Sequence, residues 1–96
     1  MKLRFTSRAH RDVDEAMGFY RQNSARAAVE FLLAIEAAGI AIKANPLAYA
    51  KVSNELRRYM IRNFPYGLYY RAVTDEILIV AVVHAKRDPK VWRDRE

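Results

Sequence analysis

The sequence predicts an α+β domain in which an N-terminal strand and a helical hairpin pack on a largely antiparallel sheet. Residues 7–44 repeat apolar side chains at helical spacing, and Pro46 ends this region because proline cannot donate a backbone hydrogen bond. Residues 56–84 are instead rich in β-branched and aromatic residues and are broken by short turn signals. The expected order is β-α-α-β-β-β, within a single domain that spans residues 1–96.

The first strand and the first helix are expected at the N-terminus. Residues 2–6 alternate polar and apolar side chains, as a half-buried strand does. Ser7 is expected to cap the helix that follows, because its hydroxyl can accept hydrogen bonds from backbone N–H groups of the first turn. The apolar stripe of this helix has i, i+3, i+4, i+7 spacing and comprises Val13, Ala16, Met17 and Tyr20. Asn23-Ser24 should end this helix and start the next.

The second helix, about Ala25 to Ala44, is apolar on more than one face. Its core stripe is expected to comprise Ala28, Phe31, Leu32, Ile35, Gly39 and Ile42. An adjoining face carries Val29, Leu33, Ala37 and Ile40. Two helices and one sheet can hardly bury the whole circumference, so this adjoining face is either deeply buried or kept free for a partner.

Three strands are expected after a connector at residues 47–54. They cover residues 56–61, 68–73 and 76–84. Arg57 and Arg58 should point to opposite faces of the first, because side chains alternate along a strand. The third is apolar on both faces, which indicates a central position in the sheet. Simple alternation places Leu78, Val80 and Val82 on one face and Ile77, Ile79 and Val83 on the other.

Composition narrows the function classes. The chain has no cysteine, which excludes disulfides and thiolate metal sites and favours a cytoplasmic location. The N-terminus lacks the apolar run of a signal peptide, and the longest apolar run, residues 77–83, is far too short to span a bilayer. No metal or other cofactor is expected, because the only histidines, His10 and His84, are far apart in the sequence and every glycine is isolated. The net charge of +6 suits an acidic partner, a nucleic acid or an acidic protein, although it could serve solubility alone.

Residues 57–92 carry the most specific pattern. It begins with Arg57-Arg58, continues with Pro-Tyr-x-x-x-Tyr-Arg at residues 65–71, and ends with His-x-Lys-Arg-Asp-Pro at residues 84–89. In this order, after a strand and a helical hairpin, these motifs resemble the ParE/RelE superfamily of bacterial type II toxin–antitoxin toxins. The resemblance covers nearly the whole chain and implies a RelE/ParE-like fold.

Two positions favour the ParE-like branch of that superfamily. RNA-cleaving RelE-like toxins tend to carry an arginine where this chain has Gly67, and often a catalytic tyrosine where Trp92 stands. A tryptophan donates one N–H and cannot act as an acid or base. ParE-like toxins share a His-x-Arg-Arg-x-Pro signal, which residues 84–89 match except for Lys86. The resemblance therefore implies a toxin that inhibits DNA gyrase without catalytic residues and is neutralised by a small, adjacently encoded antitoxin.

Candidate contact residues follow from this interpretation. The expected gyrase-binding residues are Arg57, Arg58, Arg71, Lys86, Arg87, Trp92 and Arg93. The expected antitoxin-binding residues are Val29, Leu33, Ala37 and Ile40 on the second helix. Trp92 could also pin the C-terminal segment by burying its ring against the sheet.

Two alternatives remain. One is a RelE-like mRNA interferase, a ribosome-dependent endoribonuclease with Arg71, His84, Lys86 and Arg87 as the working groups. For His84 a structural role, donating to a backbone carbonyl, is the preferred interpretation. The other is a non-toxic, basic nucleic-acid-binding module, in which tyrosines among the arginines could stack on bases.

Overall fold

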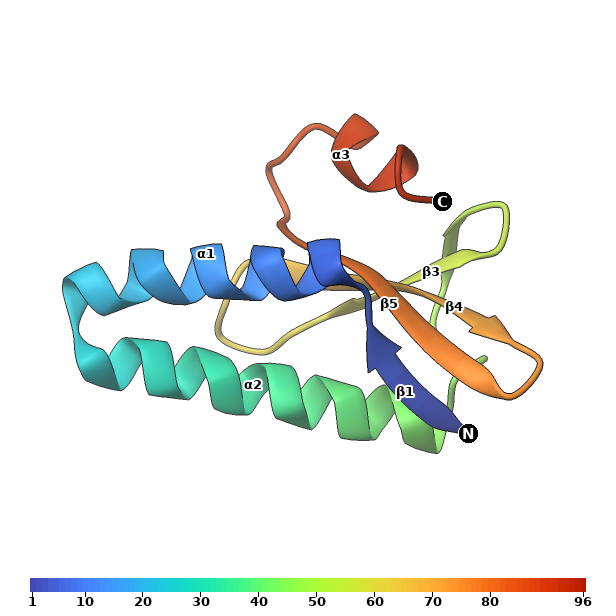
Figure 1. Cartoon of the computed structure of the whole chain (residues 1–96), viewed down its shortest axis with the longest axis horizontal. Coiled ribbons are helices and arrows are strands. Elements are labelled where there is room, and N and C mark those ends of the chain that lie inside the picture. Colours follow the sequence, from blue (N-terminus) through green and yellow to red (C-terminus); the bar gives the residue numbers. More distant parts are fainter.

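The computed structural model describes all residues, 1–96, and has the predicted α+β architecture (Figure 1). Its elements are β1 (Lys2–Phe5), α1 (Ser7–Asn23), α2 (Ala25–Ala44), β2 (Lys51–Ser53), β3 (Leu56–Met60), β4 (Tyr66–Val73), β5 (Glu76–His84) and α3 (Lys90–Arg93). Two of them were not predicted. The short β2 lies within the expected connector, and the one-turn α3 lies in the C-terminal tail.

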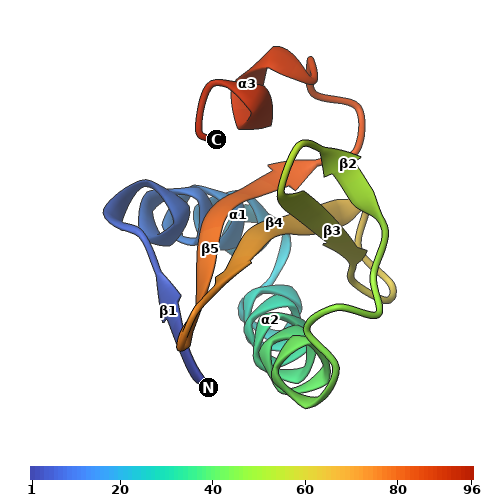
Figure 2. The same ribbon diagram turned by 90° about the vertical axis from the view of Figure 1, so that its right-hand side faces the viewer.

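The five strands form one sheet in the order β1-β5-β4-β3-β2. β5 lies between β1 and β4, which confirms its central position, and it pairs with β1 in parallel. The other pairs are antiparallel. Helices α1 and α2 cover one face of this sheet and α3 lies over the other (Figure 2).

Hydroxyl side chains set the ends of the helical hairpin. Thr6, and not Ser7, is the N-cap of α1, and its Oγ1 accepts a hydrogen bond from the Ala9 N–H at 3.1 Å. The prediction was wrong by one residue because two adjacent hydroxyls offer the same cap chemistry. Ser24 ends α1 and caps α2, where its Oγ accepts from the Ala27 N–H at 3.0 Å.

A β-bulge interrupts the pairing of β4 with β5. Tyr69 pairs with Ala81 and Tyr70 with Ile79, so Val80 is an extra residue on β5. The bulge shifts the alternation of side chains beyond it. Ile77, Ile79 and Val82 pack with the helical hairpin, whereas Val80, Ala81 and Val83 pack on the other face. The predicted faces of Val82 and Val83 were therefore wrong, since simple alternation assumes an unbroken ladder.

The α2 helix buries one stripe and exposes another. Its buried residues are Ala28, Phe31, Ile35, Ala38 and Ile42. Leu32, expected in the core, is 39% exposed, and Ala38 is buried although the predicted stripe omitted it. The adjoining face of Val29, Leu33, Ala37 and Ile40 is exposed, so it is free rather than deeply buried. The core stripe is narrower than predicted because α2 contacts the rest of the fold along only one side.

Candidate functional site

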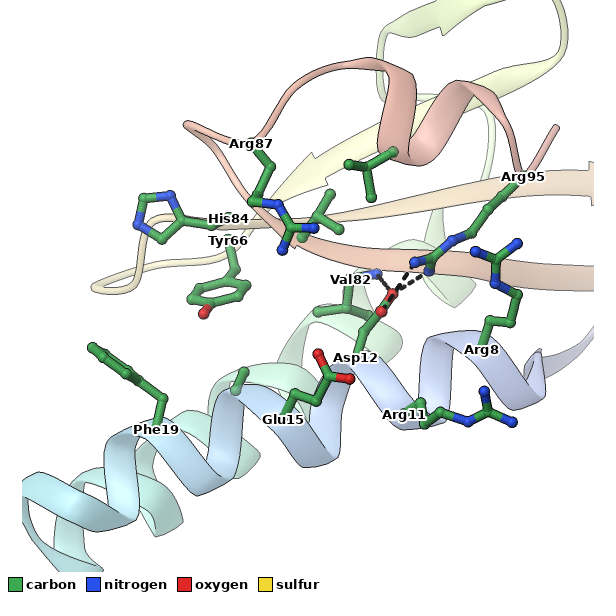
Figure 3. Close-up of a pocket in the computed structure, with 13 residues that line it drawn as sticks. Arg8, Arg11, Asp12, Glu15, Phe19, Tyr66, Val82, His84, Arg87 and Arg95 are labelled. Carbon is green, nitrogen blue, oxygen red and sulfur yellow. Dashed lines mark hydrogen bonds and ion pairs between the residues drawn. The ribbon is translucent and has the colours of Figure 1, made fainter.

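A groove of about 450 Å³ runs between α1, the end of β5 and the C-terminal segment (Figure 3). It is lined by Arg8, Arg11, Asp12, Glu15, Ala16, Phe19, Tyr66, Val82, Val83, His84, Arg87, Val91 and Arg95. The α1 residues in this list recur every three or four positions and therefore share one helix face. Its four arginines outnumber its two carboxylates, so the groove has an excess of positive charge.

An ion pair closes one end of the groove. The Asp12 carboxylate pairs with both terminal nitrogens of the Arg95 guanidinium, and the Arg95 Nη2 to Asp12 Oδ1 distance is 3.2 Å. Both side chains are almost buried, with 12% of Asp12 and 10% of Arg95 exposed. The pair lies at the β-bulge, where Asp12 also accepts the Val82 N–H at 2.9 Å and Arg95 donates to the Val80 carbonyl at 3.3 Å. One residue of α1 and one near the C-terminus thus satisfy backbone groups of the irregular strand.

His84 and Tyr66 form the other end of the groove. The His84 Nδ1 accepts a hydrogen bond from the Lys86 N–H at 3.0 Å, and its ring meets Tyr66 edge to face at 5.3 Å. The preferred structural role of His84 is thus consistent with the geometry, but the predicted bond was reversed: the ring accepts from an N–H instead of donating to a carbonyl. Burial raises the pKa of the Tyr66 phenol, and the nearby Arg87 offsets part of that rise.

The four residues proposed for an mRNA interferase do not come together. His84 and Arg87 line the groove, but Arg71 pairs with Leu78, six residues before His84 on β5. At about 3.3 Å per residue, that separation is roughly 20 Å along the strand. Lys86 lies in the turn after β5 and does not line the groove. An acid, a base and phosphate-binding cations therefore do not converge on one point.

The Gly67 position has little room for the arginine that an mRNA interferase is expected to carry there. A Cβ there would lie 3.0 Å from the Met60 Sδ and 3.3 Å from the Arg58 Cγ and Cδ. Both of those side chains come from β3, which pairs with β4 at this point. A larger residue at position 67 would require both of them to move.

The predicted gyrase-binding residues lie in different parts of the fold and differ in their exposure to solvent. Arg57 points toward the helical hairpin, on the face opposite to Arg58 as predicted, and its Nη1 donates to the carbonyls of Leu47 at 3.2 Å and Tyr49 at 2.7 Å. Trp92 is 7% exposed and stacks on Tyr69, with ring centroids 4.9 Å apart and an angle of 14°. This confirms that Trp92 pins the C-terminal segment to the sheet. The exposed members are Arg58, Lys86, Arg87 and Arg93, with Arg71 partly exposed.

Sequence reasoning missed Arg8 and Asp12 as members of the groove. Both lie next to the expected apolar stripe of α1, but nothing in their spacing distinguishes them from solvated charges. Asp12 and Arg95 are separated by 83 positions, so no local pattern links them.

Of the tyrosines proposed for base stacking, Tyr69 is 2% exposed and Tyr70 is fully buried, so neither can stack on a base. Tyr59 and Tyr66 are half-buried and pack against the core of the hairpin face.

Two further features of the chain concern metal-binding groups and membrane-spanning helices. Its histidine and carboxylate side chains form no group of three or more that could hold a metal ion. None of its helices combines the length and the apolar character that crossing a membrane requires.

Comparison with known proteins identifies the family. The family model described as "ParE toxin of type II toxin-antitoxin system, parDE" matches residues 3–89. A solved structure from P. aeruginosa, described as a chromosomal ParDE TA system, matches with a TM-score of 0.78 and 18% identity, over 88% of this chain and 95% of the other. A search of curated proteins found no match. The chain belongs to the ParE toxin family of type II toxin–antitoxin systems.

Proposed function

We propose that this toxin acts in the cytoplasm by inhibiting DNA gyrase, without cleaving bonds itself, and that a small cognate antitoxin neutralises it. The observation that carries this proposal is the family match across residues 3–89. The solved structure of similar fold is described as a ParDE system, which pairs a toxin with its antitoxin.

The geometry supports inhibition by binding over RNA cleavage. The candidate ribonuclease residues are divided between the groove and the far part of the sheet, and Gly67 is closely covered by Arg58 and Met60. Trp92 is buried against Tyr69, so its indole is not presented to a substrate. A protein that acts by occupying a surface needs none of these groups to meet.

The proposed gyrase contacts are the cations around the end of β5 and α3. Lys86 and Arg87 lie in the exposed turn after β5, and Arg93 is exposed on α3. Trp92 would act indirectly, because it holds α3 on the sheet and so fixes where Arg93 lies. Arg57 would contribute least, since its guanidinium is bound to two backbone carbonyls.

The proposed antitoxin surface is the outer face of α2. Val29, Leu33 and Ile40 are 56%, 57% and 72% exposed, and Ala37 lies between them on the same face. Covering such a row of apolar side chains with an apolar segment would remove it from water, which favours association.

Gyrase inhibition is tested with the purified full-length toxin. We expect supercoiling by gyrase to fall and cleaved DNA complexes to accumulate, while ribosome-bound mRNA stays intact. Arg87→Gln should weaken inhibition, whereas Arg21→Gln, the same charge change at the far end of α1, should not. Site-specific mRNA cleavage by the pure protein would establish the interferase alternative instead.

Neutralisation is tested by induced expression in bacteria, with and without the neighbouring reading frame. Growth arrest that the neighbouring frame relieves would establish a toxin–antitoxin pair, and absence of toxicity would favour the nucleic-acid-binding module. Leu33→Asp should weaken antitoxin binding by about 1–3 kcal/mol if the residue lies at the centre of the interface. The matched control Glu30→Asp is on the same helix and should leave binding unchanged. If Leu33→Asp unfolds the protein, the outer face of α2 is part of the core and this assignment is wrong.

A further inference from the structure

A second cavity, of about 370 Å³, lies where the start of α1, β4 and the C-terminal segment meet. Its lining is Thr6, Ser7, Arg8, Arg71, Val80 and Arg95. Three arginines, from α1, β4 and the C-terminal segment, thus surround one space, and none of the lining residues carries a carboxylate. Figure 3 shows the Arg8 side chain extending from α1 toward the Arg95 guanidinium.

Two of these arginines have donors that find no acceptor within the protein. The Nε atoms of Arg71 and Arg95 are shielded from solvent, and neither has a hydrogen-bond partner. Arg57, by contrast, donates to two backbone carbonyls. Buried donors in folded proteins are nearly always paired, so two guanidinium groups with an unpaired Nε beside one cavity form a cluster of donors that the acceptors of the chain do not saturate.

The cavity is also held in a fixed shape. Asp12 and the Val80 carbonyl bind the terminal nitrogens of Arg95, so its guanidinium is oriented before any ligand arrives. Asp12 balances the charge of Arg95, and therefore Arg8 and Arg71 supply the net positive charge. The backbone N–H groups of Ser7 and Arg8 lie in the first turn of α1, where a helix has no internal acceptors and carries partial positive charge.

We propose that this cavity binds a phosphate group, either as free phosphate or nucleotide or as part of a nucleic-acid backbone. Arginine forks and the first turn of a helix are the groups that proteins use to bind phosphate oxygens. A phosphate presents more acceptor oxygens than the two of a carboxylate, which suits donors that approach from α1, β4 and the C-terminal segment. The proposal does not depend on gyrase inhibition, because it concerns the toxin alone.

The test is a titration of the free, full-length protein with inorganic phosphate, followed by nuclear magnetic resonance of the arginine Nε–H signals. Saturable shifts of the Arg71 and Arg95 signals are expected, with the Arg57 signal unchanged. Acetate at the same ionic strength serves as the carboxylate probe and should not produce them. If acetate shifts the same signals to the same extent, the cavity accepts a carboxylate of a protein partner and the proposal is wrong.

Matched substitutions separate a site from general positive charge. Arg8→Gln and Arg71→Gln should each weaken phosphate binding by about tenfold or more, because each removes a charged donor. Arg21→Gln removes the same charge at the far end of α1 and should change binding by less than about twofold. The amide spectra of the variants confirm that the fold is retained. An equal loss in Arg21→Gln, or no saturable binding of phosphate, would overturn the proposal.

A short DNA duplex and a nucleoside triphosphate then identify the source of the phosphate. If the same two variants weaken duplex binding more than Arg21→Gln does, the cavity receives a backbone phosphate. If only phosphate and the nucleotide depend on Arg8 and Arg71, the ligand is a free phosphate compound. Either result supports the site, and both remain interpretable if gyrase proves not to be the target.

Discussion

The two faces of the sheet are built in different ways. On the face covered by α1 and α2, 13 buried residues form one cluster, and an aromatic group of Tyr20, Phe31, Phe64 and Tyr66 lies at its end. On the other face only six buried residues gather, five from the strands and Trp92 from α3, the single turn of helix that covers this face. The first face is fixed by two long helices, whereas the second is held by Trp92 and the Asp12–Arg95 pair. Local opening is therefore expected on the α3 face long before the hairpin separates from the sheet.

The largest effect is expected from a cavity on the hairpin face. Phe31 is fully buried and meets Tyr20, Phe64 and Tyr66 at centroid distances of 5.2 to 5.3 Å. Phe31→Ala should lower the free energy of unfolding by about 3–5 kcal/mol, measured by urea denaturation. Phe31→Leu should cost less, because it fills more of the space. A loss below about 1 kcal/mol in the alanine variant would show that the aromatic group does not support this face.

Removal of the main anchor of the α3 face should cost less. Trp92→Ala should lower the free energy of unfolding by about 2–3 kcal/mol, because α3 can detach while the rest of the fold persists. Trypsin should then cut after Lys90 and Arg93 much faster than in the original protein, and Trp92→Phe should restore much of the protection. If trypsin instead cleaves throughout the variant chain at similar rates, the two faces unfold together and the comparison fails.

The difference between the faces also separates what the sequence could predict from what it could not. The bounds of α2 and β5 follow from local signals, namely the Ser24 cap, Pro46 and a run of β-branched residues. The hairpin face could therefore be predicted largely from periodicity. The α3 face could not, because the bulge at Val80 depends on how β4 pairs with β5, and a four-residue helix has no periodic signal.

The candidate site shows the same limit more strongly. Trp92 could be predicted as an anchor because it is the only tryptophan in a charged tail. The partners of Arg95 could not, since Asp12 lies on another helix and the paired backbone groups exist only because of the bulge. Charged residues such as Asp12 and Arg95 gain their roles because the tertiary structure brings them together, and a single sequence does not show which distant residues will meet.

The ion pair at the bulge is the second anchor of the α3 face. Asp12→Asn keeps the shape of the side chain and can still accept the Val82 N–H, but it leaves the Arg95 charge unbalanced. We expect a loss of about 1.5–2.5 kcal/mol in the free energy of unfolding, with little dependence on salt because the pair is almost buried.

The exposed pair of Arg4 and Glu76 is the matched control for the Asp12 substitution. Its atoms are 3.3 Å apart, but the Arg4 side chain is 59% exposed, so Glu76→Gln should cost no more than about 1 kcal/mol and depend on salt. Equal losses in Asp12→Asn and Glu76→Gln would mean that the buried pair adds nothing to the attachment of α3.

The smallest effect concerns Tyr69 and Tyr70, adjacent residues that face opposite layers. The Tyr70 hydroxyl donates to the Pro46 carbonyl at 2.7 Å on the hairpin face, whereas no hydrogen bond is formed by the Tyr69 side chain, which lies under Trp92. Tyr70→Phe should therefore lower the free energy of unfolding by about 0.5–1.5 kcal/mol at neutral pH. Tyr69→Phe is the matched control and should stay within about 0.5 kcal/mol of the original protein.

Alkaline pH gives an independent measure of the burial of the Tyr70 phenol. Burial raises the pKa of the Tyr70 phenol above its ordinary value of 10.0. Because the pKa of Tyr70 is higher in the folded state, the stabilisation from its protonated phenol is fully present below pH 10.0. This stabilisation is lost as pH rises through the pKa of the folded state, since the unfolded chain releases the proton first. Urea denaturation at a series of pH values should show a shallower alkaline decline in Tyr70→Phe. Some decline should remain, since burial also raises the pKa of Tyr20 and Tyr66. An unchanged alkaline slope in Tyr70→Phe would show that burial on the hairpin face does not shift the pKa of the Tyr70 phenol.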